Sequence, residues 1–216
     1  MKSRFQYIVL VIMLVILVMP FIRHAGILGW LTSSLLVAMI PLASYYALSA
    51  DRKRAIVLIL LSLPFVFLDA LHLFYARDYL SVIMYSFGTL LYLYIVILLL
   101  KNLLTRETIT TDMIYCAISI YLLIGIMWAG VYGLLETLAP GSFSTTSGTV
   151  DYVYFSFVTL TTVGYGDVAP LTALSKRLAV FEAGMGGIYM AIIVALIVGR
   201  YLSPRADQNP SDPNGS

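Results

Sequence analysis

Long apolar stretches, separated by short polar breaks, occupy most of this chain. A helix needs ~20 apolar residues to cross ~30 Å of hydrocarbon, and six stretches come close to or exceed that length. They cover residues 5–22, 27–48, 55–75, 80–104, 113–138 and 175–202. The first follows Lys2 and Arg4 as a signal peptide would, but its apolar core is long for a signal and no small-residue cleavage site follows. We therefore expect six transmembrane helices.

The break between the last two stretches has an internal pattern of its own. Residues 140–148 are rich in Pro, Gly, Ser and Thr, which predicts a surface loop. Residues 151–160 are apolar and aromatic but too few to span, which favours a re-entrant half-helix. Non-helical backbone at membrane depth is tolerated only where it is buried in protein or lines a water-filled cavity. A half-helix followed by a Gly-containing return therefore predicts a pore or a binding cavity.

The returning segment, Thr161-Thr162-Val163-Gly164-Tyr165-Gly166-Asp167, indicates chemistry of the backbone rather than of side chains. Glycines at alternate positions allow backbone angles that a Cβ would forbid, so several carbonyl groups can face one side. Carbonyl oxygens arranged in this way are ligands for a monovalent cation. One strand cannot enclose an ion, whereas a ring of four can replace its hydration shell.

Residues Thr162-Val163-Gly164-Tyr165-Gly166 resemble the filter signature of the tetrameric potassium channels. The resemblance extends over roughly residues 112–202. It implies an all-α membrane protein with six transmembrane helices, a re-entrant pore half-helix and a filter in a tetrameric pore. It also implies K⁺ as the permeant ion, held by the carbonyls of Thr162, Val163, Gly164 and Tyr165, a homotetramer, and no organic cofactor.

The resemblance also suggests residues that support the filter. An aromatic at Tyr154 or Phe155 would bond to the acid after the filter, Asp167, and simple packing of these rings is the alternative. This chain departs from the common pattern by having Tyr154-Phe155 in place of two tryptophans, and Val158 in place of an acid found in some members. The first departure keeps one hydrogen-bond donor, and the second removes a buried carboxyl contact.

The last stretch contains an acid and a run of small residues. Glu182 is costly within a span unless it is paired or hydrated. We expect it to support the pore half-helix by hydrogen bonds to Thr159, Thr161 or Thr162, rather than to bind ions, and burial would favour its uncharged form. Gly186, with Gly187 second, lies where the resemblance implies a gating hinge; a close-packing site without motion is the alternative.

Composition excludes several other classes. Hydrophobic residues make up 61% of the 216 and charged residues 11%, against roughly 25% charged in soluble domains. A net charge of +2 without a basic block argues against nucleic acid, and the lone Cys116 excludes an intramolecular disulfide. Asp69, His72 and Glu182 are too far apart along the chain to suggest a catalytic site, so we expect that the protein is not an enzyme.

The basic residues predict an orientation. With both termini cytoplasmic, nine of the thirteen Lys and Arg residues fall on the inner side, and four on the outer side. The nine are Lys2, Arg4, Arg52, Lys53, Arg54, Lys101, Arg106, Arg200 and Arg205; the four are Arg23, Arg77, Lys176 and Arg177. We expect a multi-pass plasma-membrane protein, in contact with membrane lipids, with its filter towards the outside. The cluster Arg52-Lys53-Arg54 is interpreted as a cytoplasmic loop.

The chain divides into a peripheral part, residues 1–108, a pore part, residues 109–202, and a tail, residues 203–216, expected to be disordered. Residues 80–100 contain no Lys or Arg, so the four peripheral helices are predicted not to sense voltage steeply. Asp69 and His72 could pair as a pH sensor, and a simple polar patch is the alternative. A gating ligand would have to act on the membrane part or on a regulatory subunit.

Two other functions compete with a potassium channel. A subunit of a potassium-uptake transporter would normally carry four related filter loops in one chain, and this chain has one. A regulatory or receptor-like membrane subunit whose filter does not conduct would have the same sequence features. Potassium flux through the purified protein distinguishes the channel from the non-conducting subunit.

Overall fold

A computed structural model describes residues 4–22, 26–48, 52–74, 78–105, 110–145 and 150–202. Its helices are α1 (Gln6–Ile22), α2 (Gly26–Leu48), α3 (Arg52–Phe74), α4 (Asp78–Leu104), α5 (Thr111–Leu138), α6 (Tyr152–Leu160) and α7 (Ala173–Leu202). Two short strands, β1 (Phe143–Thr145) and β2 (Val168–Pro170), flank α6 along the chain. Each of the six predicted long stretches, and the predicted half-helix, coincides with a helix to within a few residues at its ends, over the residues that the structure describes.

Four helices are long and apolar enough to cross a membrane, judged by length and composition. Their candidate spans are Leu31–Leu48, Tyr79–Leu104, Thr111–Leu138 and Ala173–Gly199. Helices α1 and α3 contain shorter apolar stretches, Gln6–Phe21 and Ile56–Leu68. The transmembrane character is therefore confirmed, whereas a count of six spans stays a prediction.

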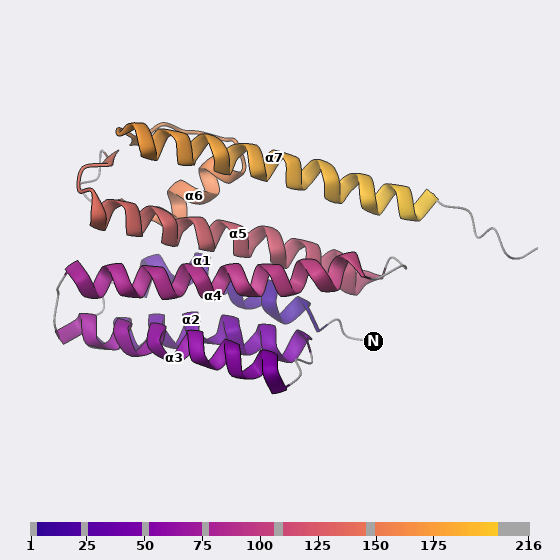
Figure 1. Ribbon diagram of the computed structural model, residues 1–216, viewed down its shortest axis with the longest axis horizontal. Coiled ribbons are helices and arrows are strands. Elements are labelled where there is room, and N and C mark those ends of the chain that lie inside the picture. The colour runs from indigo at the N-terminus through magenta and orange to yellow at the C-terminus, as the bar shows by residue number, and fades with distance from the viewer. Residues whose placement is uncertain are drawn as a thin grey trace, which may run out of the picture.

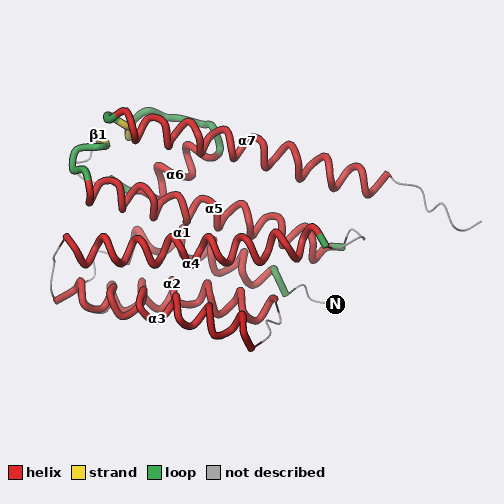
Figure 2. Tube along the Cα trace, in the orientation of Figure 1, coloured by secondary structure: helices red, strands yellow, loops and turns green. Residues whose placement is uncertain are grey.

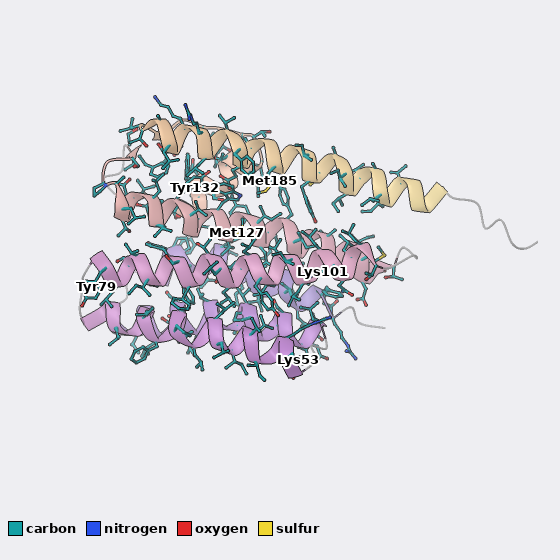
Figure 3. All side chains as sticks on the ribbon, in the orientation of Figure 1. Lys53, Tyr79, Lys101, Met127, Tyr132 and Met185 are labelled. Carbon is teal, nitrogen blue, oxygen red and sulfur yellow. The ribbon has the colours of Figure 1, made fainter. Side chains whose placement is uncertain are left out.

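The helices lie roughly along one direction, and α5 lies between helices α1–α4 on one side and α6 and α7 on the other (Figure 1). Helix α4 packs against both α3 and α5, and α1 packs against α2 and α5. The beginning of α1 and the end of α7 lie at the same end of the molecule (Figure 1). Lys53 and Lys101 are near that end, and Tyr79 is near the other (Figure 3).

The core follows α5, which places one face against α4 and another against α6. Ile120, Leu123 and Tyr132 on α5 are among its fully buried side chains, and Leu91, Ile95 and Leu99 bury one face of α4. The spacing of these α4 residues is that of one helical face. Many other apolar side chains stay exposed, as expected where lipid rather than water surrounds the protein.

Two local predictions are wrong. Residues 143–145 of the predicted loop form β1, which pairs antiparallel with β2 so that Ser144 lies opposite Ala169; the fold is therefore not purely helical. Phe143 and Ser142 are buried, so the described part of this stretch packs against the protein instead of lying on its surface. The basic cluster 52–54 begins α3 and is not a loop. The predicted tail, residues 203–216, lies outside the described residues.

Candidate functional site

The half-helix α6 is fixed at both of its ends. Asp151 precedes it as the N-cap, and its Oδ1 accepts hydrogen bonds from Val153 N at 3.0 Å and Tyr154 N at 3.1 Å. A capping aspartate of this kind satisfies backbone donors and stabilises the helix by ~1 kcal/mol. At the other end Thr161 is the C-cap. The helix lies between α5 and α7 (Figure 1).

The segment after α6 turns back on the last turn of the helix. Both Val163 N and Gly164 N donate to the Val158 carbonyl, at 3.0 and 3.2 Å, and Thr162 N donates to Thr159 at 2.9 Å. From there the chain runs beside α7 to the end of the molecule where α7 begins (Figure 2). The backbone from Thr162 onward is thereby attached to the C-terminal end of α6.

Positive φ values recur at alternate residues of this segment. They are 58° at Thr162, 58° at Gly164 and 80° at Gly166. Glycine adopts such angles without penalty, whereas a β-branched residue such as Thr162 is a genuine outlier. A strained residue of this kind costs about 1–3 kcal/mol and is typical of functional sites.

The segment leaves its polar backbone groups available. In the described part of the chain, no hydrogen bond ends on a carbonyl oxygen of Thr162, Val163, Gly164 or Tyr165. Val163 is 53% exposed and Tyr165 72% exposed. Apart from the glycine and its two chain neighbours, no atom of the described chain lies within 4 Å of the position that a Cβ on Gly164 or Gly166 would take. The arrangement is one in which several carbonyl oxygens are free to coordinate a cation.

A side-chain hydrogen bond links α6 to the residue after the filter sequence. The Tyr154 hydroxyl donates to Asp167 Oδ2 at 2.8 Å, the contact expected for one of the two aromatics. This hydrogen bond, with burial as a second cause, raises the pKa of Tyr154 to about 12. Phe155 packs instead, with its ring 4.9 Å from that of Tyr132 and 5.2 Å from that of Phe143.

Glu182 has different partners from those expected. Its side chain is fully buried, and it is hydrogen-bonded to Ser156 on α6 and Tyr132 on α5 rather than to the threonines. The reason is geometric: Glu182 faces the middle of α6, whereas Thr159, Thr161 and Thr162 lie at its C-terminal end. Sequence reasoning missed both partners; the one signal was that a buried acid needs donors.

Gly186 lies in close contact with the end of α6. A Cβ there would be 2.2 Å from the Leu160 carbonyl oxygen, while one at Gly187 would meet nothing within 4 Å. The Tyr121 hydroxyl of α5 donates to the same Leu160 oxygen at 3.3 Å. The contact supplies a packing reason for Gly186; a hinge role for Gly186 or Gly187 stays a prediction.

The remaining candidates lie apart from this segment. The side chains of Asp69 and His72 are outside those the structure describes. Within the described ranges, no group of three His, Cys, Asp or Glu side chains could hold a metal ion. A carbonyl site is of a different kind, because its ligands are backbone oxygens.

Comparison with known proteins gives matches to the C-terminal part of the chain. Residues 109–203 match the family described as "Ion channel". The inward rectifier potassium channel Kirbac3.1 of Paramagnetospirillum magnetotacticum is 32% identical over 91 residues, which are 40% of this chain and 29% of the relative. Two-pore potassium channel 1 of Arabidopsis thaliana is 44% identical over 62 residues, or 29% and 15% of the two chains. Two-pore potassium channel 4 of the same plant is 39% identical over 54 residues, or 25% and 19%.

These matches cover only part of this chain and part of each relative. The chain covers less than a third of the length of each of these relatives. No solved structure matches. The matched residues 109–203 include α5, α6 and α7 and the segment with the exposed carbonyl groups. On these findings residues 109–203 match an ion-channel family and are similar in sequence to potassium channels.

Proposed function

We propose that four copies of this chain form a potassium-selective channel whose filter is Thr162-Val163-Gly164-Tyr165-Gly166. The carbonyls of Thr162, Val163, Gly164 and Tyr165 coordinate K⁺, and conduction is passive. The observation that carries the proposal is the alternation of positive φ values in a segment whose carbonyls have no hydrogen bond within the described chain. Such a strand can exchange water for carbonyl oxygen around an ion only when other strands complete the ring.

The presence of a single strand in each chain supports a tetramer in this proposal. One chain contributes one filter sequence, and the side chains of Val163 and Tyr165 are more than half exposed. The face of α7 is uncovered too, with Val180, Phe181 and Ile188 among its exposed side chains. In the proposed assembly these surfaces meet other subunits, the pore or lipid.

Residues 109–202 are the pore part in this proposal, and residues 1–108 a peripheral helical part. Six spans, cytoplasmic termini and a plasma-membrane location complete it. The grouping of Lys53 and Lys101 near the end of the molecule that holds both the start of α1 and the end of α7 supports that orientation, because cytoplasmic sides carry the excess of Lys and Arg (Figure 3). The filter would then lie towards the outer side.

Purified protein reconstituted into liposomes tests the function. A K⁺ gradient should drive flux that Ba²⁺ blocks, and the same gradient of Na⁺ should drive little. Chemical cross-linking should give a band at four times the subunit mass. Equal K⁺ and Na⁺ permeability would overturn the filter assignment. Absence of flux from a folded tetramer would favour the non-conducting regulatory subunit over the channel.

A further inference from the structure

Three helices meet at the carboxyl group of Glu182. The Ser156 Oγ of α6 lies 2.5 Å from Glu182 Oε1, and the Tyr132 hydroxyl of α5 hydrogen-bonds to Glu182 Oε2. Ser156 Oγ also lies 2.8 Å from the carbonyl oxygen of Gly125 on α5. Tyr132 lies between α5 and α7 (Figure 3). The cluster therefore connects α5, α6 and α7 inside the protein, and Glu182 is 0% exposed.

The hydrogens in this cluster can be counted. A serine hydroxyl carries a single hydrogen, yet Ser156 Oγ is within hydrogen-bond distance of both Gly125 O and Glu182 Oε1. If Glu182 were ionised, both neighbours would be acceptors, and one of the two short oxygen pairs would have no hydrogen between its atoms. If Glu182 is protonated, every pair has one: Glu182 donates to Ser156, Ser156 donates to Gly125, and Tyr132 donates to Glu182.

The surroundings favour the same assignment. Among the described residues, the hydrogen-bond partners of Glu182 are Ser156 and Tyr132, and no Lys, Arg or His forms an ion pair with it. The other titratable group facing it is Tyr121 of α5. A buried carboxylate with no cation nearby is strongly unfavourable, whereas a neutral acid whose donor and acceptor are both satisfied is not.

We propose that Glu182 is a neutral carboxylic acid that positions the pore half-helix, holding α6 through Ser156 and α5 through Tyr132. The consequence for conduction rests on the proposed function. Because Val163 and Gly164 are hydrogen-bonded to Val158 of α6, a displacement of α6 displaces the filter backbone. Glu182, Ser156 and Tyr132 are thus positioning residues, and none of them touches the ion.

Two substitutions separate shape and hydrogen-bond pattern from charge. Glu182→Gln keeps the length of the side chain; one amide N–H donates to Ser156 and the carbonyl accepts from Tyr132, as in the neutral acid, and the amide adds one further N–H. Glu182→Asp keeps the acid but is one methylene shorter, so it cannot reach both partners. We expect the Gln variant to keep the K⁺ over Na⁺ permeability ratio, and the Asp variant to lower it by roughly tenfold, the effect of a buried group left unsatisfied.

Infrared spectroscopy of the purified full-length chain gives a readout that does not depend on conduction. At neutral pH the wild-type spectrum should contain the C=O stretching band of a protonated, buried carboxylic acid, and Glu182→Gln should remove it. A spectrum without such a Glu182 band would overturn the protonation. A Gln variant as impaired in folding and selectivity as the Asp variant would overturn the positioning by a neutral group. If wild-type liposomes pass no K⁺, the proposed function fails, while the infrared result still decides the state of Glu182.

Discussion

Thr162, Gly164 and Gly166 carry the backbone geometry on which the proposed filter depends. Their φ values are positive, and the residues between them, Val163 and Tyr165, are not among those with positive φ. Alternation of this kind turns successive peptide units so that their carbonyls can share a side. Two of the three positions are glycine, where the conformation is free of side-chain strain. The third, Thr162, is held by its attachment to α6.

We predict that Gly164→Ala abolishes selective K⁺ conduction while leaving tetramer assembly largely intact. An alanine at φ 58° costs about 1–2 kcal/mol in the left-handed region, so the carbonyl beside it should reorient. The permeability ratio of K⁺ to Na⁺ in liposomes measures the effect, and size-exclusion chromatography measures assembly.

Gly141→Ala is the matched control for this substitution. Gly141 has φ 82°, and a Cβ there also meets nothing within 4 Å, but the residue lies between α5 and β1. It should show the backbone penalty in thermal stability and none of the loss in selectivity. Unchanged selectivity in Gly164→Ala would contradict the filter assignment.

At the residue scale the sequence predicted contacts close along the chain better than distant ones. The hydrogen bond between Tyr154 and Asp167 was expected because the resemblance to potassium channels implied it. The partners of Glu182 could not, because Tyr132 is 50 residues away and its approach depends on how α5 and α7 pack. An acid in an apolar stretch implies that hydrogen-bond donors lie nearby, but the sequence does not show which helix supplies them.

The element that determines the site is α6, because it is packed on both sides. Phe157 fills the space over Gly125 of α5, where a Cβ would be 2.7 Å from the ring. On the other side Gly186 of α7 lies against Leu160. An isolated helix of 9 residues is only marginally stable in water, so these contacts and the Asp151 cap contribute to the stability of α6.

The pair Gly186→Ala and Gly187→Ala tests the contact between α6 and α7. The added methyl at Gly186 would lie 2.2 Å from a backbone oxygen, so α7 must shift, at a cost of typically 1–3 kcal/mol for overpacking. The one at Gly187 has open space and should stabilise the helix by up to ~1 kcal/mol. Thermal unfolding of the purified protein should therefore move in opposite directions for the two variants.

The same pair discriminates packing from hinge motion. A packing role predicts that only Gly186→Ala lowers stability and selectivity. If instead Gly187→Ala changes the open probability while Gly186→Ala leaves both stability and current unchanged, the bend lies at Gly187. The close contact between Gly186 and Leu160 then does not contribute to function.

The helices were predictable because apolar length is a strong signal, and α6 was predictable because it is aromatic and too short to span. The two strands were not. Each has three residues, and β1 lies in a polar stretch where Phe143 is the one large apolar side chain. Its pairing with β2 is set by contacts between segments 25 residues apart, such as Ser144 and Ala169.

At the scale of the whole molecule, α5 connects the peripheral helices to the proposed pore, because it packs against helices of both parts. Helix α4 packs along α5, and α1 packs against it from another side. A change in the peripheral helices would therefore reach α6 through α5.

We predict that the conductance of the channel does not depend steeply on voltage. A voltage sensor needs several charges that cross the membrane field, each contributing ~2.3 kcal/mol per 100 mV. In α4 the basic residue is Lys101, in the last turn and near the same end of the molecule as Lys53 (Figure 3), so no regular row of charges lies within the span. Recordings from purified protein in a planar bilayer, at symmetrical K⁺, measure conductance against voltage.

Lys101→Gln is the control: because this residue lies at the end of α4, its neutralisation should leave the conductance–voltage curve unchanged. A steep sigmoidal curve that flattens in Lys101→Gln would assign voltage sensing to α4, and a steep curve unaffected by that substitution would assign it to another part of the chain; either result would contradict the prediction.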